Sequence, residues 1–202
     1  MAITPRQFEQ LQARLSGVRR AEPSAAEISA RAVSTKNQIV IGVDPSLRGT
    51  GYGVIQLVKP NPRALAHGTI RCPATWTRSR CLAKIAQTLR EIVVRHQPTV
   101  CAIEGLFFAQ NLQTALIMGE ARGAAMAVLA EAGLDIFEIA PRKVKQALVG
   151  YGAAQKTAVS KMVQRLLQLP EPPSPDAADA LAIALAHSHD GKRAFGAGAK
   201  AI

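Results

Sequence analysis

Four carboxylates occupy positions where they could do chemistry. Asp44 ends the apolar run "QIVIGVD", and Glu104 comes at the end of the apolar run "TVCAIEG", so each marks a point where a buried strand would leave the core. Asp176 and Asp179 lie three residues apart in "PDAADALAIALAH", which places them on one face at the start of an apolar helix. An ionised carboxylate in such surroundings is costly unless it is paired or binds a metal.

Each of these acids also has an ordinary structural explanation when it is taken alone. Asp44 precedes a proline in "DPSLRGTG", which is rich in turn formers, and Glu104 stands where a strand leaves the core. Asp176 and Asp179 would favour a helix N-terminus through the helix dipole, and for this pair alone a helix cap is the preferred interpretation.

Taken together, the four acids favour a metal site. Two strand-end acids and a helical pair suit a two-metal phosphodiesterase, because carboxylate oxygens bind Mg²⁺ and two ions roughly 4 Å apart can stabilise both the attacking and the leaving oxygen. Clustered carboxylates without cations would repel one another and raise each other's pKa. We therefore predict that all four are catalytic and bind metal, and we call them the carboxylate cluster: Asp44, Glu104, Asp176 and Asp179.

The elements that would position the cluster follow from hydrophobic periodicity. Strands are expected over 38–44, 49–58, 64–72, 99–105 and 134–140. Helices are expected over 82–98, 112–133, 141–150, 154–169 and 175–189. Three strands in close succession predict an antiparallel meander, and the later alternation of strands and helices predicts βαβ crossovers. The fold class is therefore α/β, with a mixed five-stranded sheet flanked by helices.

Length, charge and cysteine content narrow the class of protein. The 202 residues suffice for one substantial domain over 38–190, with a flexible N-terminal extension over 1–37 and a flexible tail over 191–202. The formal net charge of +11 attracts polyanions and makes nucleic acid the leading partner. Three cysteines without CxxC spacing indicate neither zinc nor disulfides, and no secretory signal or membrane span is found, so we expect a cytoplasmic protein.

Five segments in order resemble the RuvC family of Holliday junction resolvases, the crossover junction endodeoxyribonucleases: "IGVDPSLRGTGYGVI", "AIEGLFFAQN", "GEARGAA", "RKVKQALVGYGAAQK" and "PDAADALAIALAH". The resemblance covers about residues 38–190. It implies a ribonuclease H-like fold, a symmetric homodimer, Mg²⁺ as cofactor, and paired symmetric nicks in four-way junction DNA during recombination and repair. It also implies that the catalytic acids are the four members of the carboxylate cluster. Substitution of Mn²⁺ for Mg²⁺ and partnership with a branch-migration helicase complex stay open.

The resemblance also implies three DNA-binding residues. Phe107 matches a family aromatic at the junction, although a core Phe is the ordinary alternative. Lys145 and Lys156 match family lysines near the DNA, and Lys156 follows a glycine-containing turn at a helix N-terminus, which suits an anion. The Gly- and Ala-rich helix over 112–133 would contribute to the dimer contact. Trp76 falls in an expected loop, where packing and DNA contact are both open.

Two rival functions come from other classes of protein. An actin-like ATPase or sugar kinase also carries a phosphate loop after its first strand, but Asp44 is followed by proline, no second loop of this kind occurs, and 202 residues are too few for two lobes. A junction-binding protein without nuclease activity would have no use for the carboxylate cluster. The prediction is accordingly a metal-dependent endonuclease.

Overall fold

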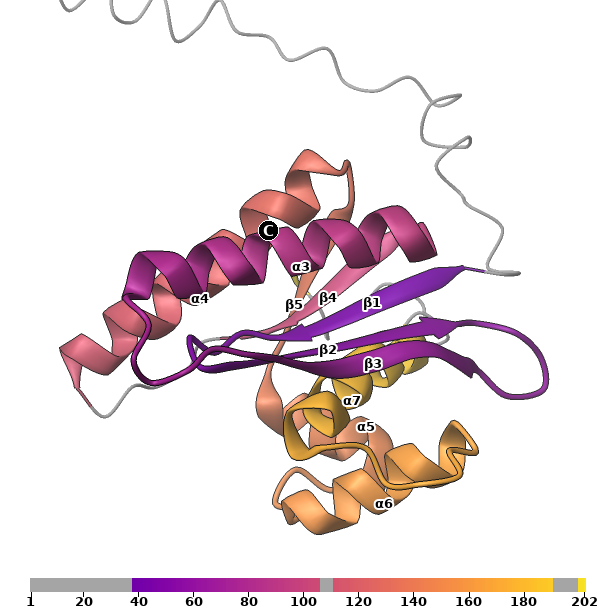
Figure 1. The fold of residues 1–202 in the computed structure, drawn as a ribbon. Coiled ribbons are helices and arrows are strands. Elements are labelled where there is room, and N and C mark those ends of the chain that lie inside the picture. The colour runs from indigo at the N-terminus through magenta and orange to yellow at the C-terminus, as the bar shows by residue number, and fades with distance from the viewer. Residues whose placement is uncertain (1–37, 106–110, 191–199) are drawn as a thin grey trace, which may run out of the picture. The chain divides into compact units, whose positions relative to one another are not determined.

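The computed structural model describes residues 38–105, 111–190 and 200–202, which form one six-stranded sheet with helices on both faces (Figure 1). The strands are β1 (Ile39–Asp44), β2 (Gly49–Gln56), β3 (Arg63–Arg71), β4 (Val100–Glu104), β5 (Asp135–Ile139) and β6 (Lys200–Ala201). The helices are α3 (Arg78–His96), α4 (Leu112–Glu131), α5 (Pro141–Val149), α6 (Lys156–Leu166) and α7 (Pro175–Asp190). None of these helices combines the length and apolar character that crossing a bilayer requires.

The sheet is mixed, as its hydrophobic patterns predict. Its strand order is β3-β2-β1-β4-β5-β6, with an antiparallel β1–β2–β3 meander and parallel β1–β4 and β4–β5 pairs. The ten predicted strands and helices all form, in the predicted chain order. The two-residue β6, which the sequence did not predict, pairs antiparallel with the edge of β5.

The two faces of the sheet are covered by different helices (Figure 1). On one face, α3 and α4 pack on aliphatic side chains of the strands, and α3 buries one stripe consisting of Cys81, Ile85, Leu89 and Ile92. On the other face, α5, α6 and α7 form a second core. The helix α7 is central to this core, because most of its side chains between Ala177 and Ala186 are buried.

Glycines on the strands bring the backbone of α7 unusually close to the sheet. A Cβ atom placed on Gly42 would lie 2.1 Å from the Ala180 carbonyl oxygen, and one placed on Gly51 would lie 2.0 Å from the Asp176 carbonyl oxygen. On Gly53, a Cβ atom would lie 2.7 Å from the Leu181 side chain. Because no side chain other than glycine's fits in these contacts, they set the position of α7 over β1 and β2.

Candidate active site

Asp44 and Glu104 end two neighbouring parallel strands on the same face of the sheet. The register pairs Val43 of β1 with Ile103 of β4, so the next residue along each strand is one of the two acids. Side chains alternate between faces along a strand, and Val40 of β1 belongs to the α7-side core. Asp44 therefore faces α7, and the same alternation places Glu104 beside it.

Asp176 and Asp179 reach this end of the sheet from the first turns of α7. The helix begins at Pro175, so Asp176 lies in its first turn, where the helix dipole favours a negative charge. A Cβ atom on Gly49 would lie 3.2 Å from Asp176 Oδ2. The start of the helix is also tied to β3, because the Thr69 and Ser174 hydroxyl oxygens are hydrogen-bonded at 3.0 Å. Asp176 can therefore both stabilise the N-terminus of α7 and contribute to the carboxylate cluster.

Burial and mutual repulsion raise the pKa values of the two strand-end acids. Burial is the largest cause for Glu104, followed by the charge of Asp44, and its pKa rises to about 8. The pKa of Asp44 is also raised, first by burial, although a hydrogen bond with Glu104 acts in the opposite direction. The charges of Asp179 and Asp176 raise it further. At neutral pH Glu104 is thus mainly protonated and donates to the Asp44 carboxylate.

Lys156, the first residue of α6, joins the carboxylate cluster from one side. Its Nζ atom donates to Asp179 Oδ2 at 2.9 Å. This hydrogen bond raises the pKa of Lys156, and the charges of Asp44 and Glu104 contribute in the same direction. The Lys156 side chain is 78% exposed, so its ammonium group faces both the cluster and solvent.

The cluster has the composition of a site for a hard divalent cation. All four of its side chains offer carboxylate oxygens, which Mg²⁺ and Mn²⁺ prefer, and their repulsion would be relieved by bound positive charge. In the described part of the chain, no three Asp, Glu, His or Cys side chains already form a group that could hold a metal ion. Asp179 is instead paired with Lys156, and Asp44 with Glu104.

Arg122 of α4 is a residue of this region that the sequence-based interpretation missed. It is 8% exposed, and its guanidinium donates to the backbone oxygen of Glu104 and forms an ion pair with Glu138 of β5. Arg122 thereby joins α4, the end of β4 and β5. The signal that could have identified it is a lone arginine in a run of Gly and Ala, together with an acid in the apolar strand "DIFEI".

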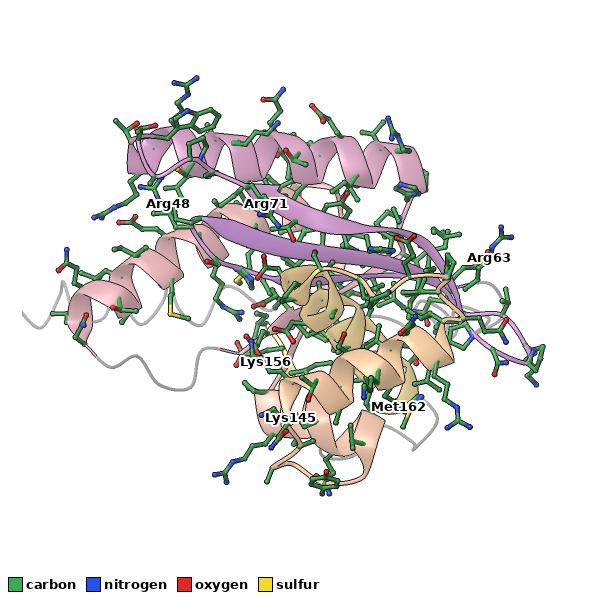
Figure 2. The ribbon with its side chains drawn as sticks, turned by 60° about the horizontal axis from the view of Figure 1, so that its bottom comes forward. Arg48, Arg63, Arg71, Lys145, Lys156 and Met162 are labelled. Carbon is green, nitrogen blue, oxygen red and sulfur yellow. The ribbon has the colours of Figure 1, made fainter. Side chains whose placement is uncertain are left out.

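Of the three predicted DNA-binding residues, the structure describes Lys145 and Lys156. Lys145 lies on α5 and is half-buried, and Figure 2 shows it on the same side of the sheet as Lys156. Both helices pack against α7, so both lysines belong to the elements that surround the cluster. Phe107 lies outside the described residues.

Comparison with known proteins gives consistent matches. Residues 40–187 match the family described as "Crossover junction endodeoxyribonuclease RuvC". Proteins of that name from Akkermansia muciniphila and Pasteurella multocida are each 45% identical to the chain, over 148 and 157 residues. These alignments cover 73% and 78% of this chain, and 89% and 82% of the two relatives.

Solved structures resemble the chain over most of its length. Thermus thermophilus RuvC in complex with a Holliday junction substrate matches with a TM-score of 0.76 and 32% identity, over 82% of this chain and 99% of that one. A yeast mitochondrial Holliday junction resolvase matches with a TM-score of 0.57 at 12% identity, over 90% and 91% of the two chains, which indicates a shared fold alone. The predicted ribonuclease H-like mixed sheet is confirmed by these matches.

Proposed function

Because the chain belongs to the RuvC family of crossover junction endodeoxyribonucleases, we propose that it resolves four-way DNA junctions by paired symmetric nicks in recombination and repair. The observation that carries this proposal is the gathering of four carboxylates at one end of the sheet. A protein that only binds junctions would gain nothing from burying mutually repelling acids, whereas phosphodiester hydrolysis uses them to bind metal.

We propose Mg²⁺ as the cofactor, with two ions in each active site and Mn²⁺ as a substitute. The ligands would be Asp44, Glu104, Asp176 and Asp179. Oxygen ligands favour hard cations over zinc, and the three cysteines belong to or adjoin the α3–α4 core rather than the cluster. When bound, the ions supply charge neutralisation at the scissile phosphate and a more acidic water molecule.

Individual residues would have different roles in binding the metal ions and the DNA. Asp44 interacts with the three other acids and would serve both ions. Lys156 pairs with a cluster carboxylate and is largely exposed, so it can contact a DNA phosphate that enters the site. Lys145 and Phe107 are proposed as further contacts to the junction, Lys145 through a phosphate and Phe107 by stacking or wedging between bases.

The proposed homodimer would present two such sites to the two strands. Along α4, Leu112 and Leu116 are 76% and 57% exposed, and Cβ atoms on Gly119 and Gly123 would meet nothing within 4 Å. These residues follow one another at helical spacing and leave an apolar stripe on which a second copy could pack by two-fold symmetry. Sedimentation should give a dimer for the wild type and a monomer for Leu116→Glu, and a wild-type monomer would contradict this contact.

A synthetic four-way junction tests the nuclease directly. In Mg²⁺ we expect paired nicks that DNA ligase can reseal, and with EDTA we expect none. Asp44→Asn should lower cutting by about a thousandfold or more while junction binding persists. Glu91→Gln, at an exposed acid of α3, is the matched control and should cut normally. Cutting by Asp44→Asn at the wild-type rate would contradict the proposal.

We also propose domain boundaries, a cellular location and a partner for the protein. We propose that residues 38–190 are the nuclease domain, to whose sheet Lys200–Ala201, from the predicted tail, add the short edge strand β6. The predicted extension over 1–37 lies outside the described residues. Limited proteolysis followed by mass spectrometry tests these boundaries. Action on chromosomal junctions and three unpaired cysteines are in keeping with a cytoplasmic protein, and a branch-migration helicase complex remains a predicted partner.

A further inference from the structure

The positive charge of the chain is concentrated in one stretch, none of whose basic side chains belongs to the carboxylate cluster or the three predicted DNA-binding residues. Residues 45–90 contain eight of the 25 Lys and Arg residues and none of the 14 Asp and Glu residues. This stretch forms the β1–β2 loop, the β2–β3 hairpin and most of α3. A long segment without any acid produces a positive field that its own side chains cannot neutralise.

The part of this stretch nearest the carboxylate cluster is where the β1–β2 loop meets the end of β3. Arg71, the last residue of β3, is in register with Gly49, which approaches Asp176. The Cys72 backbone N–H donates to the Arg48 carbonyl oxygen at 3.1 Å, which joins the loop to the strand end. Figure 2 shows Arg48 and Arg71 at this end of the sheet and Arg63 at the opposite end of β3.

Two of the arginine side chains here, those of Arg48 and Arg80, make contacts that hold them in place. The Arg48 guanidinium donates through Nη1 to the Pro73 carbonyl oxygen at 2.5 Å and lies 3.2 Å from Cys81 Sγ. The Arg80 guanidinium carbon lies 4.0 Å from the centroid of the Trp76 ring, a cation–π contact. Each guanidinium has five N–H donors, so most remain for a ligand, and little conformational entropy is lost when one binds.

Three of the four arginines at this position have no partner of opposite sign among the described residues. The fourth, Arg78, is paired with Glu120 at 2.9 Å. Arg48, Arg71 and Arg80 have no carboxylate partner in the described part of the chain. All three are exposed, and exposed arginines without a carboxylate partner suit phosphates better than an uncharged partner.

We propose that these residues form a second DNA-binding surface, the β3–α3 shoulder, made of Arg48, Arg71, Trp76 and Arg80. The inference rests on the proposed function. The shoulder would bind the phosphate backbone of the duplex arm that continues from the strand in the active site. Figure 2 shows Arg48 and Arg71 apart from Lys145 and Lys156, which lie on the α5–α6 side of the sheet. The shoulder would set the direction of that arm and make no contact with the reacting phosphate.

Salt dependence of binding is the test. A fluorescent four-way junction is titrated with protein in Ca²⁺ or EDTA, so that it is not cut, at several salt concentrations. For Arg71→Ala combined with Arg80→Ala, we expect about tenfold weaker binding and a slope of log K against log salt that is smaller by about two, because two phosphates are no longer neutralised by arginine. Arg63→Ala is the matched control, since it changes the same residue type at the far end of the same strand, and it should leave the slope unchanged.

Trp76 provides a second measurement, because it is the only tryptophan in the chain. Its emission should change on junction binding in the wild type, and the same titration in Arg63→Ala should give the same change. The proposed shoulder would be contradicted by an unchanged Trp76 emission or by an unchanged salt slope in the double variant. An equal loss of junction affinity in Arg63→Ala would also contradict it. Failure of the wild type to bind or cut the junction would instead contradict the proposed function.

Discussion

The two faces of the sheet are packed in different ways, and only one of them holds the carboxylate cluster. On the α3–α4 face, large side chains such as Ile41, Ile85 and Leu129 separate the helices from the strands. On the other face, glycines of β1 and β2 meet the alanine-rich backbone of α7. Side chains can adjust to a small change in volume, whereas backbone in direct contact cannot. The position of α7 is therefore fixed most tightly where the helix brings Asp176 and Asp179 to the ends of β1 and β4.

Gly51→Ala should have the largest effect of any change that leaves the four acids in place. The new Cβ atom would lie 2.0 Å from the Asp176 carbonyl oxygen, so α7 must move. We expect a loss of about 3 kcal/mol or more in unfolding free energy, and a loss of junction cutting of about a hundredfold or more, since a displacement of about 1 Å is enough for that.

Ile85→Val is the corresponding change on the opposite face. Removal of one methylene from this buried side chain should cost about 1 kcal/mol in urea unfolding and leave cutting unchanged. If Gly51→Ala retained wild-type cutting, or Ile85→Val lost it, the packing of α7 on the glycines could not be what positions the carboxylate cluster.

Arg122→Gln tests a contact between the α3–α4 face and the backbone of the active site. It leaves Glu138 without its ion-pair partner and the Glu104 carbonyl without its donor. We expect about 2 kcal/mol of lost stability and a higher Mg²⁺ concentration for half-maximal cutting, because the backbone that carries Glu104 is no longer held.

Arg90→Gln is the control for Arg122→Gln. Arg90 joins α3 to α4 through an exposed ion pair with Glu131 at 3.2 Å, so its loss should change stability by no more than about 0.5 kcal/mol. Its Mg²⁺ dependence should match that of the wild type. If Arg122→Gln lowers stability but leaves the Mg²⁺ dependence unchanged, Arg122 supports the fold and does not position Glu104.

The effect of Glu104→Gln on stability should be smallest in acid and should grow as the pH rises. The pKa of Glu104 rises from its ordinary value of 4.5 to about 8, so the folded protein holds this proton more tightly than the unfolded chain does. In EDTA, the stability of the wild type should therefore fall as pH rises from about 4.5 to about 8.

Because a glutamine side chain cannot ionise, the variant should lose less stability over the same pH range. By urea unfolding at pH about 9 it should be more stable than the wild type by about 2 kcal/mol, with little difference at pH about 5. Parallel pH profiles for the two proteins would contradict the raised pKa of Glu104.

Much of the fold was predictable because it depends on local patterns. Alternation along strands and the 3.6-residue period of helices identified the ten main elements, and the acids at strand ends stood out against apolar runs. The two-residue β6 has too little pattern to identify, since it is defined by its pairing with β5.

The sequence alone determined which side chains the protein has for chemistry and the elements that carry them. Only the tertiary structure decided how they meet. The glycines of "GTGYG" alternate along one face of β2, yet their function became visible only against α7. Arg122 is buried where α4 meets the end of β4 and β5, and Lys156 pairs with Asp179 across 23 residues. Such contacts depend on the packing of elements far apart in the chain, and neither composition nor periodicity records that packing.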